Sequence, residues 1–118
     1  MAELSMKLSE IEGDTPVTII HLTGEVDAEN YHELDEKAAG VIKGGSRNIV
    51  LDMSNLGFMS SAGFRSMHKI YGAINAGDAS GGLRLLKPSD DVRRLIKTMG
   101  FDSFVSIHDD LQEAISAF

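Results

Sequence analysis

The stretch from Ile49 to Phe64, which reads IVLDMSNLGFMSSAGF, decides the fold of this chain. It begins inside a run from Asn48 to Met53 in which aliphatic residues are interrupted only by Asp52. Such a run is typical of a strand that is covered on both faces. A short polar loop and a second apolar pair, Phe58 and Met59, come next. The stretch therefore predicts a buried strand that leads through a loop into a helix.

Two adjacent serines, Ser60 and Ser61, stand where that helix should begin. Serine is a favoured N-cap residue, so the pair could serve only as a cap. The N-terminus of a helix is also electropositive, which makes it a good place for a phosphate group. Gly63 adds a position without a side chain, where another molecule could approach closely. A structural cap and a phosphate-bearing site both agree with these residues.

The rest of the chain alternates between strand and helix patterns. Strands are expected at 6–12, 16–26, 48–53, 83–86 and 104–107, and helices from Asp27 to Gly44, from Ser60 or Ser61 to Gly77, from Ser89 to Gly100, and from Asp109 or Asp110 to Phe118. The first two strands could pair as a hairpin. The later alternation favours parallel strands with helices against them. We expect one α/β domain over residues 1–118, with a mixed sheet of four to five strands and about four helices packed on it.

Helical spacing assigns the side chains that should face the core. In the first helix they are Tyr31, Leu34, Ala38, Val41 and Ile42, and in the third they are Val92, Leu95, Ile96 and Met99. Asp27 is expected to be the N-cap of the first helix and Ser89 that of the third.

The overall charge limits the kind of partner. The chain has 118 residues, with 11 Lys and Arg against 18 Asp and Glu, for a net charge of −7. Nucleic acid and anionic membrane surfaces both require clustered cations, so neither is an expected partner. The first ten residues lack the apolar core of a signal peptide, and no apolar run reaches the roughly 20 residues that span a bilayer. We expect a cytoplasmic protein.

Several kinds of chemistry are also disfavoured. The chain has no cysteine, which removes disulfides, thiol catalysis and thiolate metal sites. Its four histidines lie on different expected elements, and no pair has the i, i+4 spacing of a helical metal site. The paired glycines at 44–45 and 81–82 lack the Lys-Ser/Thr of a phosphate loop. We therefore expect no catalytic activity, no metal and no cofactor.

Three segments together resemble the STAS domain, the fold of bacterial anti-sigma factor antagonists. Leu22 to Asp27 resembles the family's strand that ends in Gly, an acid, an aliphatic residue and Asp. Ile49 to Gly63 resembles its strand, loop and phosphorylation motif, and Gly82 to Phe104 is similar to its last strand-helix-strand unit. The second segment is the most specific of the three. Together the three segments cover nearly the whole chain, in the order in which the family has them.

This resemblance implies a switch. In the family, an anti-sigma factor that is itself an ATP-using serine kinase binds the unphosphorylated antagonist and phosphorylates one serine. The phosphorylated form is released, and a phosphatase resets it. The acceptor falls on Ser61 here, and the implied partner-binding residues are Asp27, Asn30, Ser60, Ser61, Ala62, Gly63, Phe64 and Arg65. ATP would be bound by the partner.

The chain departs from the family motif, Asp-Ser-Ser/Thr/Ala-Gly-Leu, at one position. Ser60 stands where the motif has its Asp, which leaves two adjacent serines and makes Ser60 a second candidate acceptor. Gly63 and Phe64 match the Gly and Leu of the motif. Arg65, one helical turn after Ser61, could pair with a phosphate there.

Two other functions stay open at this level. One is a constitutive STAS scaffold, or the small subunit of a stress-signalling or membrane lipid-transport assembly, without a phosphorylation switch. The other is a small phosphocarrier enzyme, which has little support because no histidine stands at a motif-bearing strand end.

Overall fold

The computed structural model describes residues 3–76, 81–116 and 118. The elements follow one another in the order β1 (Leu4–Ile11), β2 (Val17–Val26), α1 (Tyr31–Lys43), β3 (Asn48–Met59), α2 (Ser61–Ile74), β4 (Gly82–Leu86), α3 (Asp90–Thr98), the 3-10 turn η1 (Phe101–Ser103), β5 (Ser106–His108) and α4 (Leu111–Ser116). The predicted order of strands and helices is confirmed. No helix in the ranges described is long and apolar enough to cross a membrane.

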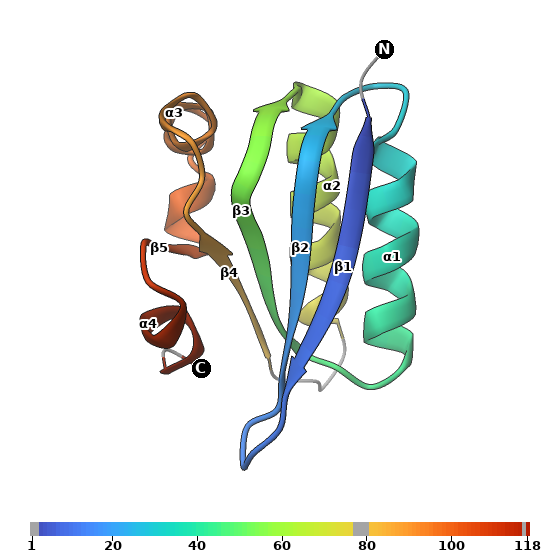
Figure 1. The fold of residues 1–118 in the computed structure, drawn as a ribbon, viewed down its shortest axis with the longest axis vertical. Helices are drawn as coiled ribbons and strands as arrows, with labels where there is room; N and C mark the ends of the chain where they lie inside the picture. Colours follow the sequence, from blue (N-terminus) through green and yellow to red (C-terminus); the bar gives the residue numbers. More distant parts are fainter. Residues whose placement is uncertain (1–2, 77–80, 117) are drawn as a thin grey trace.

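The five strands form one mixed sheet in the order β1-β2-β3-β4-β5 (Figure 1). The expected hairpin is present, because β1 runs antiparallel to β2 with Leu8 opposite Ile20. From β2 to β5 the strands are parallel. Parallel neighbours need crossover connections, and the helices supply them. The predicted fold class is confirmed.

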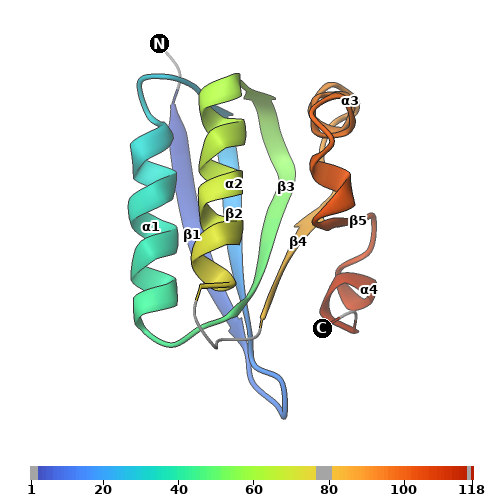
Figure 2. The ribbon, with the colours of Figure 1, turned by 180° about the vertical axis from the view of Figure 1, so that it is seen from behind.

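The sheet has two unequal faces. Helices α1 and α2 cover one face (Figure 2), where a large core includes Ile20, Leu51, Leu34 and Met67. The other face carries a smaller cluster, in which Val50 and its apolar neighbours pack against Ala114 of α4. The alternation of side chains along each strand divides the apolar residues between these two cores.

Strand β3 is longer than expected. The segment 54–57, predicted as a polar loop, continues the strand, and β2 pairs with it as far as Val26 opposite Met59. The extra residues of this pairing are in β3: His21 and Thr23 lie opposite Asp52 and Asn55, and Gly24 and Glu25 lie opposite Leu56 and Phe58. Gly24 has a φ of 109°. A Cβ on Gly24 would lie 2.1 Å from the carbonyl oxygen of Glu3, so only glycine fits there.

Some predicted boundaries and core positions are wrong. Tyr31 and Met99, assigned to apolar stripes, are 37% and 52% exposed; Tyr31 is the first residue of α1, and Met99 is the C-cap of α3. Phe104 follows η1 rather than lying in the last strand, and it is exposed as well. Helix α2 ends at Ile74 with Asn75 as its C-cap, and Gly77, the predicted stop, lies outside the described residues.

Candidate functional site

The start of α2 lies at the carboxyl ends of β2 and β3 (Figure 1). Strand β3 ends at Met59, and Ser60 is the N-cap of α2 with extended backbone angles, φ −84° and ψ 176°. The Ser60 hydroxyl accepts a hydrogen bond from the Ala62 N–H at 3.2 Å. This bond satisfies one of the free N–H groups of the helix terminus, so the predicted serine cap is present at Ser60.

The two serines are held differently. Ser60 is half-buried and its oxygen is engaged by the helix, whereas Ser61, the first residue of α2, is exposed. No acidic residue stands in the first turn of α2, in contrast to α3, which carries Asp90 and Asp91 there. The positive end of the α2 dipole is therefore not neutralised by its own side chains, and an anion on Ser61 would be stabilised there.

The residues that follow Ser61 fasten the helix to the sheet. Ala62 and Phe64 are 3% and 4% exposed, so their side chains are part of the core. A Cβ on Gly63 would lie 2.7 Å from the side chains of both Val26 and Met59. The expectation that Gly63 admits another molecule is corrected, because the close approach at this glycine comes from within the protein. Arg65, in the next turn, is exposed.

The loop between β2 and α1 is cross-linked by two polar side chains. The Asp27 carboxylate accepts hydrogen bonds from the N–H groups of Glu29 at 2.9 Å and Asn30 at 3.2 Å. The Asn30 amide accepts from the Asp27 N–H and donates to the Glu25 carbonyl, both at 2.9 Å. Asn30 is only 5% exposed. The N-cap position of α1 is Asn30, so the prediction that Asp27 is the N-cap is wrong; Asp27 instead closes the turn before the helix.

This loop and the start of α2 are direct neighbours. The Ser60 N–H donates to the Val26 carbonyl at 2.9 Å, and the Ser66 hydroxyl donates to the Tyr31 carbonyl at 3.4 Å. The structure therefore brings Asp27 and Asn30 to the same end of the sheet as Ser60, Ser61 and Arg65. We call this group of residues the α2 site: the exposed Ser61 and Arg65, the cap Ser60, and the turn of Asp27 with the buried Asn30 that supports it.

A second polar cluster, absent from the sequence-based prediction, lies on the face of the sheet opposite α1 and α2. His21 Nδ1 is 2.7 Å from an Asp52 carboxylate oxygen, and His21 Nε2 is 2.9 Å from the Ser9 hydroxyl. Burial alone would raise the pKa of the Asp52 carboxyl, but hydrogen bonds from His21 and Ser54 outweigh it and leave this pKa below the ordinary value of 3.8. The register of β2 and β3 places His21 opposite Asp52, and that register is not visible in the sequence.

Among the described residues, no group of three or more His, Cys, Asp or Glu side chains is arranged to hold a metal ion. A family model of the STAS domain matches residues 9–114. The chain belongs to the STAS domain family.

This STAS domain has relatives that are named for a role in transcription control. It is 28% identical over 115 residues to BtrV of Bordetella bronchiseptica, named as an anti-sigma factor antagonist, with 98% of this chain and 95% of BtrV covered. Its fold matches that of an anti-sigma factor antagonist from Mycobacterium paratuberculosis with a TM-score of 0.74 and 23% identity, covering 96% and 93% of the two chains.

The SpoIIAA protein of Bacillus, an anti-sigma factor antagonist, has the same fold. Its phosphorylated form matches this STAS domain with a TM-score of 0.67 and 20% identity, covering 94% of this chain and 98% of SpoIIAA. The unphosphorylated SpoIIAA matches with a TM-score of 0.73 and 21% identity, covering 94% and 95%. At these identities the comparison establishes a shared fold, with a mixed five-stranded sheet and four helices.

Proposed function

We propose that this STAS domain is an anti-sigma factor antagonist that is switched by phosphorylation of Ser61. Unmodified, it binds an anti-sigma factor that is also a serine kinase, and so frees a sigma factor for transcription. Phosphorylation by that kinase releases it, and a phosphatase resets it. The observation that carries this proposal is that Ser61 is exposed at the first residue of α2, whereas the hydroxyl of its neighbour Ser60 caps the helix.

The names of the relatives support the proposed partner. BtrV and the Mycobacterium protein are both named as anti-sigma factor antagonists, and SpoIIAA has been solved in a phosphorylated form. The present chain supplies an exposed serine hydroxyl at the start of its second helix, in a segment that resembles the family's phosphorylation motif.

The electrostatics of the α2 site account for how the switch would work. A phosphate adds about −1.5 to −2 charges and three acceptor oxygens. On Ser61 it would face the positive end of α2 and the nearby Arg65, so the free protein would tolerate it. Within an interface, the phosphate would lose its water without gaining positively charged side chains opposite it. This desolvation would cost several kcal/mol of binding free energy. Phosphorylation would therefore change binding and leave the fold intact.

The other residues of the predicted site would mainly hold Ser61 and the adjoining loop in place. Ala62, Gly63 and Phe64 are buried and hold the start of α2 against β2, while Asp27 and Asn30 order the adjoining loop. In this proposal the partner contacts Ser61, Arg65 and the Asp27 loop. The domain itself has no catalytic role: ATP is bound by the kinase, and both proteins act in the cytoplasm, where sigma factors work.

The test is a pull-down from lysate of the source cells with three baits: the unmodified protein, Ser61→Ala and Ser61→Asp. The retained partner is identified by mass spectrometry, purified, and incubated with ATP and the unmodified protein. We expect a serine kinase that is held by the first two baits, is lost with Ser61→Asp, and places phosphate on Ser61. Phosphate on Ser60, or equal recovery of a scaffold or transporter on all three baits, would refute the proposal.

A further inference from the structure

A groove runs along the free edge of the sheet, away from Ser61. Strand β1 pairs only with β2 in the described part of the chain, so its outer edge has no strand beside it. Helix α1 lies beside this edge, and it packs on the same face of the sheet as α2 (Figures 1 and 2). The groove between them has a volume of about 700 Å³.

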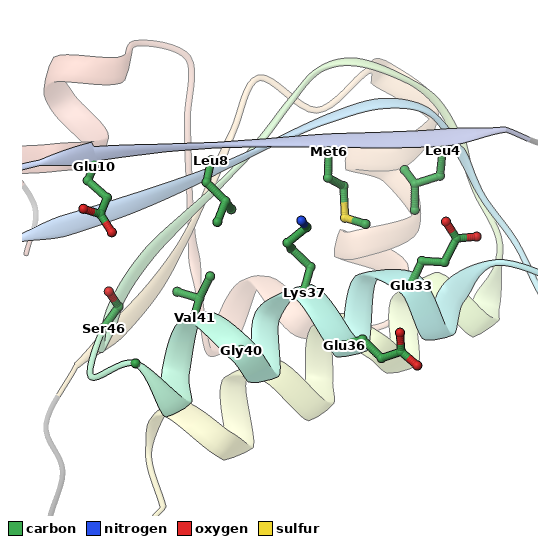
Figure 3. A pocket seen from close by; sticks show the side chains of 11 residues that line it. Leu4, Met6, Leu8, Glu10, Glu33, Glu36, Lys37, Gly40, Val41 and Ser46 are labelled. Atoms are coloured by element: carbon green, nitrogen blue, oxygen red, sulfur yellow. The ribbon is translucent and has the colours of Figure 1, made fainter.

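Strand β1 lines the groove mainly with apolar side chains. Leu4, Met6 and Leu8 point from β1 toward α1, and Val41 points back at them (Figure 3). Leu8 is 46% exposed, although it lies on the strand face that is turned to the helix. The apolar side chains alternate along the open edge strand. A strand added to this edge would cover them with its own alternating side chains.

Helix α1 leaves room for such a strand. Gly40 lies in the last turn of α1 and lines the groove, and a Cβ built on it would meet nothing within 4 Å. Because a Cβ would fit there, crowding within this chain does not explain why residue 40 is glycine. Glycine also weakens a helix relative to alanine, so it brings no gain in helix stability. A segment seated in the groove would pass directly over Gly40.

Acidic groups mark both ends of the groove. Glu10 stands at one end of β1, and Glu33 lies near Leu4 at the other end, while Glu36 points away from β1 (Figure 3). Lys37 is the only basic residue among those that line it. Leu4 and Glu10 are six residues apart on one strand, which corresponds to roughly 20 Å.

We propose that this groove binds an extended, basic segment of another protein, which adds to β1 as a sixth strand. The segment would place two apolar side chains over Met6 and Leu8 and a Lys or Arg near each end, toward Glu10 and Glu33. Main-chain hydrogen bonds to β1 would give affinity, and the alternating side chains would give specificity. A second copy of this chain fits less well, since it would bring another Glu10, Glu33 and Glu36 to the same edge.

The test uses a fluorescent peptide, Lys-Thr-Val-Thr-Leu-Thr-Lys, whose pattern reads the same in either strand direction. Fluorescence anisotropy would measure its binding to the full chain. Two control peptides isolate the causes: Glu-Thr-Val-Thr-Leu-Thr-Glu reverses the charge, and Val-Leu-Lys-Thr-Lys-Thr-Thr keeps the composition but breaks the alternation. We expect binding of the first peptide and at least about tenfold weaker binding of both controls.

Two matched glycine substitutions locate the site. Gly40→Leu fills the groove, while Gly72→Leu adds the same side chain to α2, where a Cβ also meets nothing within 4 Å. Both should keep or raise the melting temperature, because leucine favours a helix more than glycine does. Only Gly40→Leu should weaken peptide binding, by about tenfold or more.

Three results would overturn the proposal: no binding of the alternating peptide, equal binding of the rearranged peptide, or equal loss of binding in both glycine variants. A concentration-dependent dimer that Gly40→Leu abolishes would also overturn it, because the groove would then belong to a second copy. None of these outcomes bears on Ser61, so this proposal and the phosphorylation switch can fail separately.

Discussion

Ser60 and Val26 are joined by a backbone hydrogen bond of 2.9 Å, from the Ser60 N–H to the Val26 carbonyl. This bond links the N-cap of α2 to the last residue of β2, one residue before Asp27. The start of α2 and the loop of Asp27 and Asn30 are therefore held together by main-chain atoms. A change to the side chain of Ser60 or Ser61 should therefore leave the placement of the neighbouring loop intact, which makes substitutions of the two serines informative.

The two serines should respond differently to substitution. Ser60→Ala removes the cap bond to the Ala62 N–H and should lower the free energy of unfolding by about 1 kcal/mol. Ser61→Asp leaves that bond in place and adds a carboxylate to the first turn, where the helix dipole stabilises it, so stability should hold or rise slightly. Urea denaturation followed by circular dichroism would measure both. A loss of the fold in Ser61→Asp would contradict the idea that phosphorylation acts on binding alone.

Gly63→Ala should destabilise the protein by about 1–3 kcal/mol, because the new methyl group would overlap the side chains of Val26 and Met59. The matched control is Gly72→Ala in the same helix. A Cβ there meets nothing within 4 Å, so the gain in helix propensity should stabilise the protein by about 0.5–1 kcal/mol. Thermal and urea unfolding of the pair would check the opposite signs. Equal effects would show that the crowding at Gly63 is relieved at little cost.

Asn30→Ala should cost about 1–3 kcal/mol of stability, because it leaves the Glu25 carbonyl and the Asp27 N–H, whose hydrogen bonds are part-buried, without the Asn30 partner. Asn30→Asp is the sharper variant, since an ionised carboxylate can still accept from Asp27 but cannot donate to Glu25. Both should weaken binding of the anti-sigma factor by disordering the loop. Full affinity in either variant would exclude the Asp27 loop from the interface.

Stability should fall in acid through Asp52. Its pKa in the folded protein lies below 3.8, because hydrogen bonds from His21 and Ser54 outweigh the effect of burial. A depressed carboxyl pKa stabilises the folded state above the unfolded pKa, and this stabilisation disappears as the pH falls through the lower, folded value. Asp52→Asn should therefore narrow the difference in unfolding free energy between pH 6 and about pH 3, measured by urea titration at each pH.

An unchanged pH dependence in Asp52→Asn would assign the acid sensitivity to other carboxyl groups. Ser9→Ala serves as the control for the same cluster. It removes the hydroxyl next to His21 Nε2 but leaves the contact between His21 and Asp52, so the acid response should stay close to that of the unmodified protein.

The sequence by itself determined the order of the elements and the N-caps of α2 and α3. Caps, helix stripes and strand runs depend on residues within a few positions of each other, so Ser60 before α2 and Ser89 before α3 could be recognised as N-caps from local pattern alone. The resemblance of residues 49–63 to a phosphorylation motif is local in the same sense, and it led to the family that the comparison confirms.

Only the tertiary structure decided which residues meet across the chain. The extension of β3 to Met59 depends on bulges in β3 that keep it paired with β2, and the contact between His21 and Asp52 depends on the register of the same two strands. Gly63 was expected to be open to a partner but is enclosed by Val26 and Met59, and Asn30, which the resemblance gave as a partner-binding residue, is the buried centre of its loop. These relationships join residues far apart in the sequence, so packing and strand register determine them and local periodicity does not.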